Sequence, residues 1–145
     1  MHAIPDSLCY LNGEFGPLAQ ARVSVLDRGF LFGDGVYEAM PVYGKRIFRF
    51  EEHMARLGRS LAKVRIANPH TTAEWLAMCR ELITAHEADN QLVYLQVTRG
   101  VAPRDHGVVK DHRRSALDGS RYPCSAAKHL HNVEMQRRPD SSARC

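Results

Sequence analysis

The order of the periodic segments constrains the fold of this chain more than any other feature of its sequence. An alternating pattern at residues 36–43 is followed by two helical patterns, and a second alternating pattern occupies residues 92–98. Alternation places successive side chains on opposite faces of a sheet, whereas a 3.6-residue period gives a helix one apolar stripe. This succession predicts an α+β fold in which two helices pack on a largely antiparallel sheet.

Two turn signals predict hairpins. Asn12-Gly13 lies between the apolar residues 8–11 and Phe15, and this dipeptide is a strong signal for a two-residue hairpin turn. Gly44-Lys45 follows the 36–43 strand, and a type II′ turn there would lead into a return strand at residues 47–50.

The first helix is predicted to begin at Glu51, where the helix dipole favours acids, and to end before Asn68-Pro69. The second is predicted to begin at Thr71, because Glu74 three residues later completes a capping box. The expected apolar stripes are Met54, Leu57, Leu61 and Val64 on the first helix, and Trp75, Leu76, Cys79, Leu82, Ile83 and His86 on the second.

The periodicity stops after residue 106. Residues 104–145 contain only seven large apolar side chains in 42 positions, too few to offset the cost of ordering the backbone. We therefore divide the chain into a domain at 1–106 and an irregular or disordered tail at 107–145. A frameshift is one hypothesis for so abrupt a change.

Charge and composition exclude several function classes. Residues 1–103 carry 11 Lys and Arg against 11 Asp and Glu, so the net charge of +4 arises in the tail, which shows no nucleic-acid-binding motif. No apolar run approaches the ~20 residues of a membrane span, and the N-terminus does not resemble a secretory signal. The four cysteines have no CxxC spacing and are interpreted as free thiols. We expect a cytoplasmic protein without membrane, nucleic-acid or metal partners.

Three segments could carry chemistry, and each has a plainer explanation. The glycine-rich residues 27–38 could approach a ligand closely or could form a tight connection into a strand. Arg56 could bind a phosphate through its paired donors, or form a surface salt bridge with Glu52. Arg104 and His106 could both donate to one carboxylate, or belong to a polar surface loop.

Taken together and in this order, the three segments closely resemble the small N-terminal domain of the class IV, pyridoxal-phosphate-dependent aminotransferases, and most of all those specific for D-amino acids. The resemblance covers about residues 8–106 and rests on the motifs DRGFLFGDGVYE at 27–38, EHxxRL at 52–57 and QVTRGxAPRxH at 96–106.

The resemblance implies a homodimer that transfers an amino group from a D-amino acid to a 2-oxo acid with pyridoxal phosphate. Arg56 matches the phosphate-binding arginine of the family. Tyr37, Arg104 and His106 match the residues that bind the substrate carboxylate. In the family, some of these binding residues come from the neighbouring subunit. The Pro103-Arg104-x-His106 element favours the D-specific type. Branched-chain aminotransferases and aminodeoxychorismate lyases are the alternatives within the family.

The resemblance also implies that essential parts lie outside this chain. By ungapped spacing the Schiff-base lysine of the family falls a few residues beyond Cys145, and Lys110 and Lys128 lie in no matching context. We expect a truncated chain without the cofactor-binding large domain. Without that lysine and the acid that pairs with the pyridine nitrogen, normal transamination is not expected. An inactive fragment is therefore the alternative outside the enzymes.

Overall fold

The computed structural model describes residues 7–104 and 128–134. The elements in chain order are β1 (Leu8–Leu11), β2 (Glu14–Pro17), a 3₁₀ turn (Leu18–Gln20), α1 (Arg28–Phe32), β3 (Gly35–Tyr43), β4 (Arg46–Ile47), α2 (Phe50–Lys63), α3 (Thr72–Ala85), β5 (Gln91–Thr98) and β6 (Lys128–Glu134).

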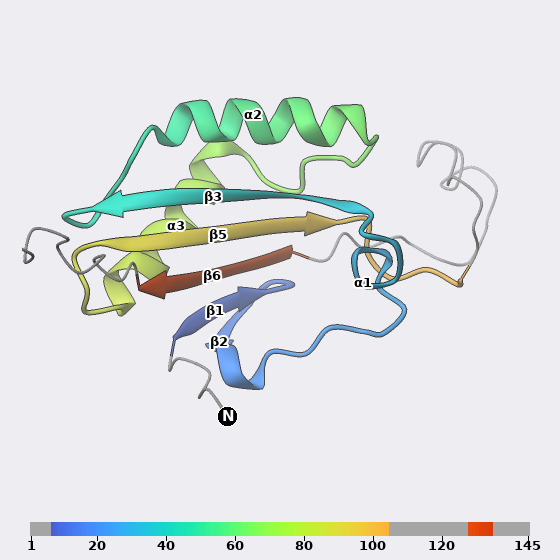
Figure 1. Cartoon of the computed structure of the whole chain (residues 1–145), viewed down its shortest axis with the longest axis horizontal. Helices are drawn as coiled ribbons and strands as arrows, with labels where there is room; N and C mark the ends of the chain where they lie inside the picture. The colour runs from blue at the N-terminus through green and yellow to red at the C-terminus, as the bar shows by residue number, and fades with distance from the viewer. Residues whose placement is uncertain (1–6, 105–127, 135–145) are drawn as a thin grey trace, which may run out of the picture.

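The strands form one six-stranded sheet in the order β2-β1-β6-β5-β3-β4, with antiparallel pairing throughout. In Figure 1, α2 runs along β3, α3 lies behind the sheet, and α1 sits where β3 begins and β5 ends. The predicted α+β architecture with two helices on an antiparallel sheet is confirmed.

The core lies between the sheet and the two long helices. Alternate residues of β3 and β5 point into it, so that Met40, Val42, Val93, Leu95 and Val97 are fully buried. The helices contribute buried side chains from the predicted stripes: Met54, Leu57 and Leu61 from α2, and Trp75, Cys79, Leu82 and Ile83 from α3, with Met78 in addition. The capping box of Thr71 and Glu74 is also present.

The boundaries of α2 differ from the prediction. Phe50 begins the helix instead of ending a strand, and β4 is limited to Arg46–Ile47. The backbone of Arg49 takes a φ of 53°, which turns the chain out of the sheet. At the other end α2 stops at Lys63, and Val64 caps it and is partly exposed, so Val64 is not part of the apolar stripe.

The hairpin at Gly44-Lys45 is confirmed, but its predicted type was wrong. Both residues have positive φ, 53° and 63°, which is the pattern of a type I′ turn, whereas type II′ requires it only at the first. Contacts distant in sequence hold Lys45 there. Its backbone N–H donates to the Asp89 carbonyl at 3.0 Å, and its Nζ donates to the His86 carbonyl at the end of α3.

Strand β6 was not predicted. It pairs with β1 through residues 129–131 and with β5 along residues 128–134, in the middle of the sheet. The expectation of irregular structure is therefore wrong for these seven residues. Backbone pairing explains the difference, because the facing edges of β1 and β5 would otherwise present unpaired N–H and C=O groups. The rest of the predicted tail, and the frameshift hypothesis with it, lies outside the described residues.

Candidate functional site

Glu38 is a charged residue at a core-facing position. It has the same parity on β3 as Met40 and Val42, so its side chain points toward α2 and is only 2% exposed. Burial of a carboxylate is unfavourable unless hydrogen bonds and opposite charge compensate it. Glu38 therefore needs partners on the helix that covers it.

Two residues of α2 supply those partners. Arg56 donates from Nε to Oε1 of Glu38 at 2.8 Å and from Nη2 to Oε2 at 2.6 Å. His53 places its Nδ1 2.8 Å from Oε2. Burial raises the pKa of the Glu38 carboxyl, but the hydrogen bonds from Arg56 and His53 and the positive charge of Arg56 outweigh it, so this pKa lies below its usual value. Glu38 is thus a stable carboxylate.

Arg56 is buried at one edge and open at the other. Its side chain is 58% exposed even though it holds the buried Glu38, whose carboxylate raises the arginine pKa. The salt bridge with Glu52 considered from the sequence is not formed, because Glu52 pairs with Arg49 at 3.0 Å. Arg56 faces a hollow of about 470 Å³, lined by Ala39, Pro41, Phe48, Arg49, Glu52, His53, Arg56 and Arg59. The basic residues make this hollow suited to an anion.

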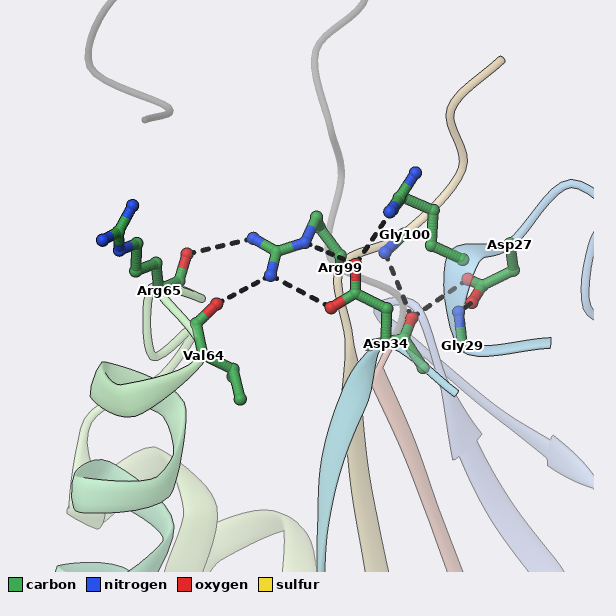
Figure 2. A network of polar contacts seen from close by, with 9 residues as sticks. Asp27, Gly29, Asp34, Val64, Arg65, Arg99 and Gly100 are labelled. Carbon is green, nitrogen blue, oxygen red and sulfur yellow. Dashed lines mark hydrogen bonds and ion pairs between the residues drawn. The ribbon is translucent and has the colours of Figure 1, made fainter. Parts of the chain in front are cut away.

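A second polar cluster, shown in Figure 2, ties the end of β5 to α1 and α2. Arg99 donates to both carboxylate oxygens of Asp34, at 2.7 and 3.0 Å, and to the carbonyls of Val64 and Arg65, at 2.7 and 3.1 Å. Arg28 donates to Asp34 at 2.9 Å. Burial raises the pKa of Asp34, but the bonds and charges of Arg99 and Arg28 outweigh it and keep that pKa below its usual value.

The glycine-rich segment packs against β5. Asp27 caps α1 by accepting from the Gly29 N–H at 2.7 Å, and it accepts from the Thr98 hydroxyl at 3.0 Å. A Cβ at Gly29 would lie 2.2 Å from Cγ2 of Thr98, and one at Gly35 would lie 2.8 Å from the Val97 carbonyl oxygen. These glycines therefore allow a tight connection, which supports the structural interpretation of the segment.

The three expected carboxylate-binding residues are only partly described. Tyr37 is 65% exposed, and its ring stacks on Tyr94 with centroids 5.6 Å apart. Arg104 is exposed and follows β5, whose last residue, Thr98, pairs with Gly35 at the start of β3. Tyr37 and Arg104 therefore belong to the same end of the sheet, whereas His106 lies outside the described residues.

Glu38 and His53 were not predicted as partners of Arg56. One signal could have identified Glu38, because a carboxylate at a core-facing position of an alternating strand must find a cation. Asp34 and Arg99 carried no comparable signal, because neither lies on a periodic face and 64 residues separate them.

Among residues 7–104 and 128–134, no three His, Cys, Asp or Glu side chains come together in a way that could hold a metal ion. No helix in this part of the chain has the length and apolarity to cross a membrane. Cys9 and Cys79 are buried free thiols.

Comparison with known families decides the identity of the fold. Residues 35–143 match the family described as amino-transferase class IV. The chain belongs to the class IV aminotransferases. The match extends beyond residue 106, where the resemblance noted from the motifs ended, and it includes β6.

Curated relatives agree with this family. A D-alanine aminotransferase of Staphylococcus haemolyticus is 40% identical over 97 residues, which are 67% of this chain and 34% of the relative. A D-alanine aminotransferase of Bacillus licheniformis is 40% identical over 95 residues, 66% of this chain and again 34% of the relative. The chain thus spans about a third of the length of the curated relatives it matches.

Solved structures show the same fold at lower sequence identity. A branched-chain aminotransferase of the thermophilic archaeon Thermoproteus uzoniensis, with norvaline, has a TM-score of 0.72 at 20% identity, covering 90% of this chain and 41% of that one. The Escherichia coli branched-chain aminotransferase has a TM-score of 0.72 at 20% identity, covering 90% and 40%. At this identity the likeness concerns the fold alone.

The class IV aminotransferases depend on pyridoxal phosphate, a cofactor that carries a phosphate group. A phosphate needs donors that are both charged and accessible. Arg56 meets both conditions, and His53, Arg49 and Arg59 line the same hollow. Arg56 therefore fits the phosphate of the cofactor.

Proposed function

We propose that this chain supplies the small-domain half of the active site of a D-amino-acid aminotransferase. In this proposal Arg56 binds the phosphate of pyridoxal phosphate, and Tyr37, Arg104 and His106 bind the carboxylate of the substrate. The bound cofactor would supply the electron sink for exchange of an amino group between a D-amino acid and a 2-oxo acid.

One observation carries the phosphate assignment. Arg56 lines a basic hollow while its Nε and Nη2 donate to Glu38, so that Nη1 is left without a partner among the described residues. A guanidinium held in this way keeps its charge and its planar donor geometry, both of which suit a phosphate oxygen. A surface arginine with a free guanidinium would lose more rotamer freedom on binding.

The substrate assignment rests on residue chemistry and on the position of Tyr37 and Arg104 at one end of the sheet. A phenol, a guanidinium and an imidazole together offer several donors to one planar carboxylate. A homodimer would allow Arg104 and His106 to serve the site of the partner chain, which would require both copies for a complete site.

The D-amino-acid type is favoured over the branched-chain type by the curated relatives. These are D-alanine aminotransferases at up to 40% identity, whereas the two branched-chain structures are 20% identical. The motif Pro103-Arg104-x-His106 points in the same direction.

The phosphate assignment is tested with pyridoxamine 5′-phosphate, which has no aldehyde and cannot react with surface lysines. The purified chain is titrated with this compound, and with pyridoxamine as the probe without phosphate, while amide chemical shifts are followed. We expect Arg56→Ala to abolish the phosphate-dependent shifts and Arg59→Ala, one turn further along α2, to keep most of them. Equal losses in both variants would indicate unspecific attraction of anions and would refute the assignment.

The substrate class is tested by assay with pyridoxal phosphate, a 2-oxo acid and either D-alanine or L-valine. Turnover of D-alanine in preference to L-valine supports the D-specific type, and the reverse preference supports a branched-chain aminotransferase. Phosphate-dependent binding without turnover of either amino acid identifies a non-catalytic portion of the enzyme.

A further inference from the structure

Arg56 is the residue through which the hollow binds an anion in the proposed function, yet a carboxylate lies directly against it. The Glu38 oxygens are 2.6 and 2.8 Å from its nitrogens. A negative charge this close weakens the attraction of Arg56 for any anion. Glu38 therefore needs an explanation other than electrostatic attraction of a ligand.

The geometry of the pair offers one. Nε and Nη2 lie on one edge of the guanidinium, and both donate to the two oxygens of Glu38. Two parallel bonds fix the plane of the group as well as its position, because rotation about the side chain would break at least one of them. Nη1 has no hydrogen-bond partner within the described part of the chain, and Arg56 lines the hollow.

Burial makes Glu38 a rigid anchor. The side chain is 2% exposed, and it projects from the paired strand β3 into the space beneath α2. His53, one helical turn before Arg56, also contacts Oε2 of Glu38 at 2.8 Å. The carboxylate is thus fixed by strand pairing, by packing and by two side chains of α2.

We propose that Glu38 is a positioning residue, which holds the Arg56 guanidinium with Nη1 directed to the hollow and thereby raises the affinity of the hollow for a phosphate monoester. Glu38 itself does not touch the ligand. This inference rests on the proposed function, because it concerns the same arginine.

The sign of one mutational effect separates this role from an electrostatic one. If Glu38 acts only through its charge, Glu38→Gln removes a negative charge beside Arg56 and tightens phosphate binding. If Glu38 positions Arg56, the same substitution weakens binding, because a neutral amide offers one acceptor where the carboxylate offers two. A purely structural role lowers the stability of the chain and leaves the affinity of the folded fraction unchanged.

The experiment titrates the chain and its variants with pyridoxamine 5′-phosphate and follows amide shifts by NMR. We expect Glu38→Gln to raise the dissociation constant at least fivefold. Glu52→Gln is the matched control, since Glu52 lines the same hollow but pairs with Arg49. We expect this control to bind within twofold of the parent or more tightly. Unchanged or tighter binding by folded Glu38→Gln overturns the proposal.

A measurement on the unmodified chain keeps the test decisive if Glu38→Gln does not fold. The Nε–H signal of Arg56 should exchange slowly with water, and its Nη signals should be resolved by hindered rotation, in contrast to those of Arg59. Addition of the probe should shift Nη1 more than Nε. An Arg56 signal that exchanges and averages like that of Arg59 overturns the proposal.

Failure of the two proposals can be told apart. If Arg56→Ala retains phosphate-dependent binding, the proposed function fails, whatever the Arg56 signals show. If Arg56→Ala loses binding but Glu38→Gln binds as well as the parent, only the positioning role of Glu38 fails.

Discussion

Removal of the Arg99 guanidinium should destabilise this fold far more than removal of an exposed guanidinium. Arg99→Met keeps most of the apolar stem but deletes four hydrogen bonds, two to Asp34 and two to the carbonyls of Val64 and Arg65. The side chains of Arg99 and Asp34 are 9% and 18% exposed. The substitution therefore leaves a poorly solvated carboxylate with one of its three hydrogen bonds from arginine side chains.

Breaking a buried ion pair by removing one partner costs about 3–5 kcal/mol. Arg28 still donates to Asp34 at 2.9 Å, so part of the compensation survives. We expect the free energy of unfolding to fall by about 3 kcal/mol, toward the lower end of that range. For a chain of this size such a loss corresponds to a decrease in Tm of roughly 10 °C.

The assay is urea unfolding followed by the fluorescence of Trp75, the one tryptophan of the chain, which is fully buried. Arg49→Met is the matched control, because the side chains of Arg49 and Glu52, which form an ion pair, are 61% and 58% exposed. Pairs of this kind contribute only about 0.2–1 kcal/mol. A loss in Arg99→Met no larger than in Arg49→Met would refute the conclusion that the Asp34–Arg99 cluster holds the end of β5 to α1 and α2.

Three further predictions concern pH, packing and reactivity. Because the pKa of Asp34 is lowered on folding, its stabilising effect is present above the unfolded value of about 3.9 and is lost as the pH falls through the folded value. Urea midpoints measured from pH 7 to pH 3 should therefore fall less steeply in Asp34→Asn than in the parent. Gly29→Ala should lower the free energy of unfolding by about 1–3 kcal/mol, because its Cβ would overlap Thr98. Gly58→Ala should raise the free energy of unfolding by roughly 0.5–1 kcal/mol, because Gly58 lies within α2 and a Cβ there meets no atom within 4 Å. Changes of the same sign in the two variants, measured by urea unfolding, would contradict this. Burial raises the pKa of the Cys79 thiol to about 12, so iodoacetamide should modify Cys79 only in urea; labelling of the native chain, located by mass spectrometry, would count against this.

Local patterns in the sequence determined most of the elements. The alternation at residues 92–98 predicts β5, the spacing of Met54, Leu57 and Leu61 predicts the buried face of α2, and Thr71 with Glu74 predicts the start of α3. Each of these signals acts over one or two turns or a few strand residues, and each involves the apolar or capping groups that fold the segment. The family resemblance was likewise carried by motifs that are continuous in sequence.

Tertiary structure decided the features that depend on distant partners. Strand β6 has few apolar residues to mark it, and it forms because the backbone edges of β1 and β5 accept it. The type I′ turn at Gly44-Lys45 depends on the backbone of Asp89 and on the end of α3.

The candidate site shows the same division. The sequence predicted that Arg56 binds a phosphate, with a salt bridge to Glu52, four residues away, as the alternative. The structure pairs Arg56 with Glu38, a residue of β3 that lies 18 positions earlier in the chain. Helical spacing reports only neighbours on the same helix, whereas the packing of α2 on the sheet brings a buried carboxylate to the arginine. The orientation of Arg56 is therefore a property of the folded chain, since it depends on a contact that no local pattern encodes.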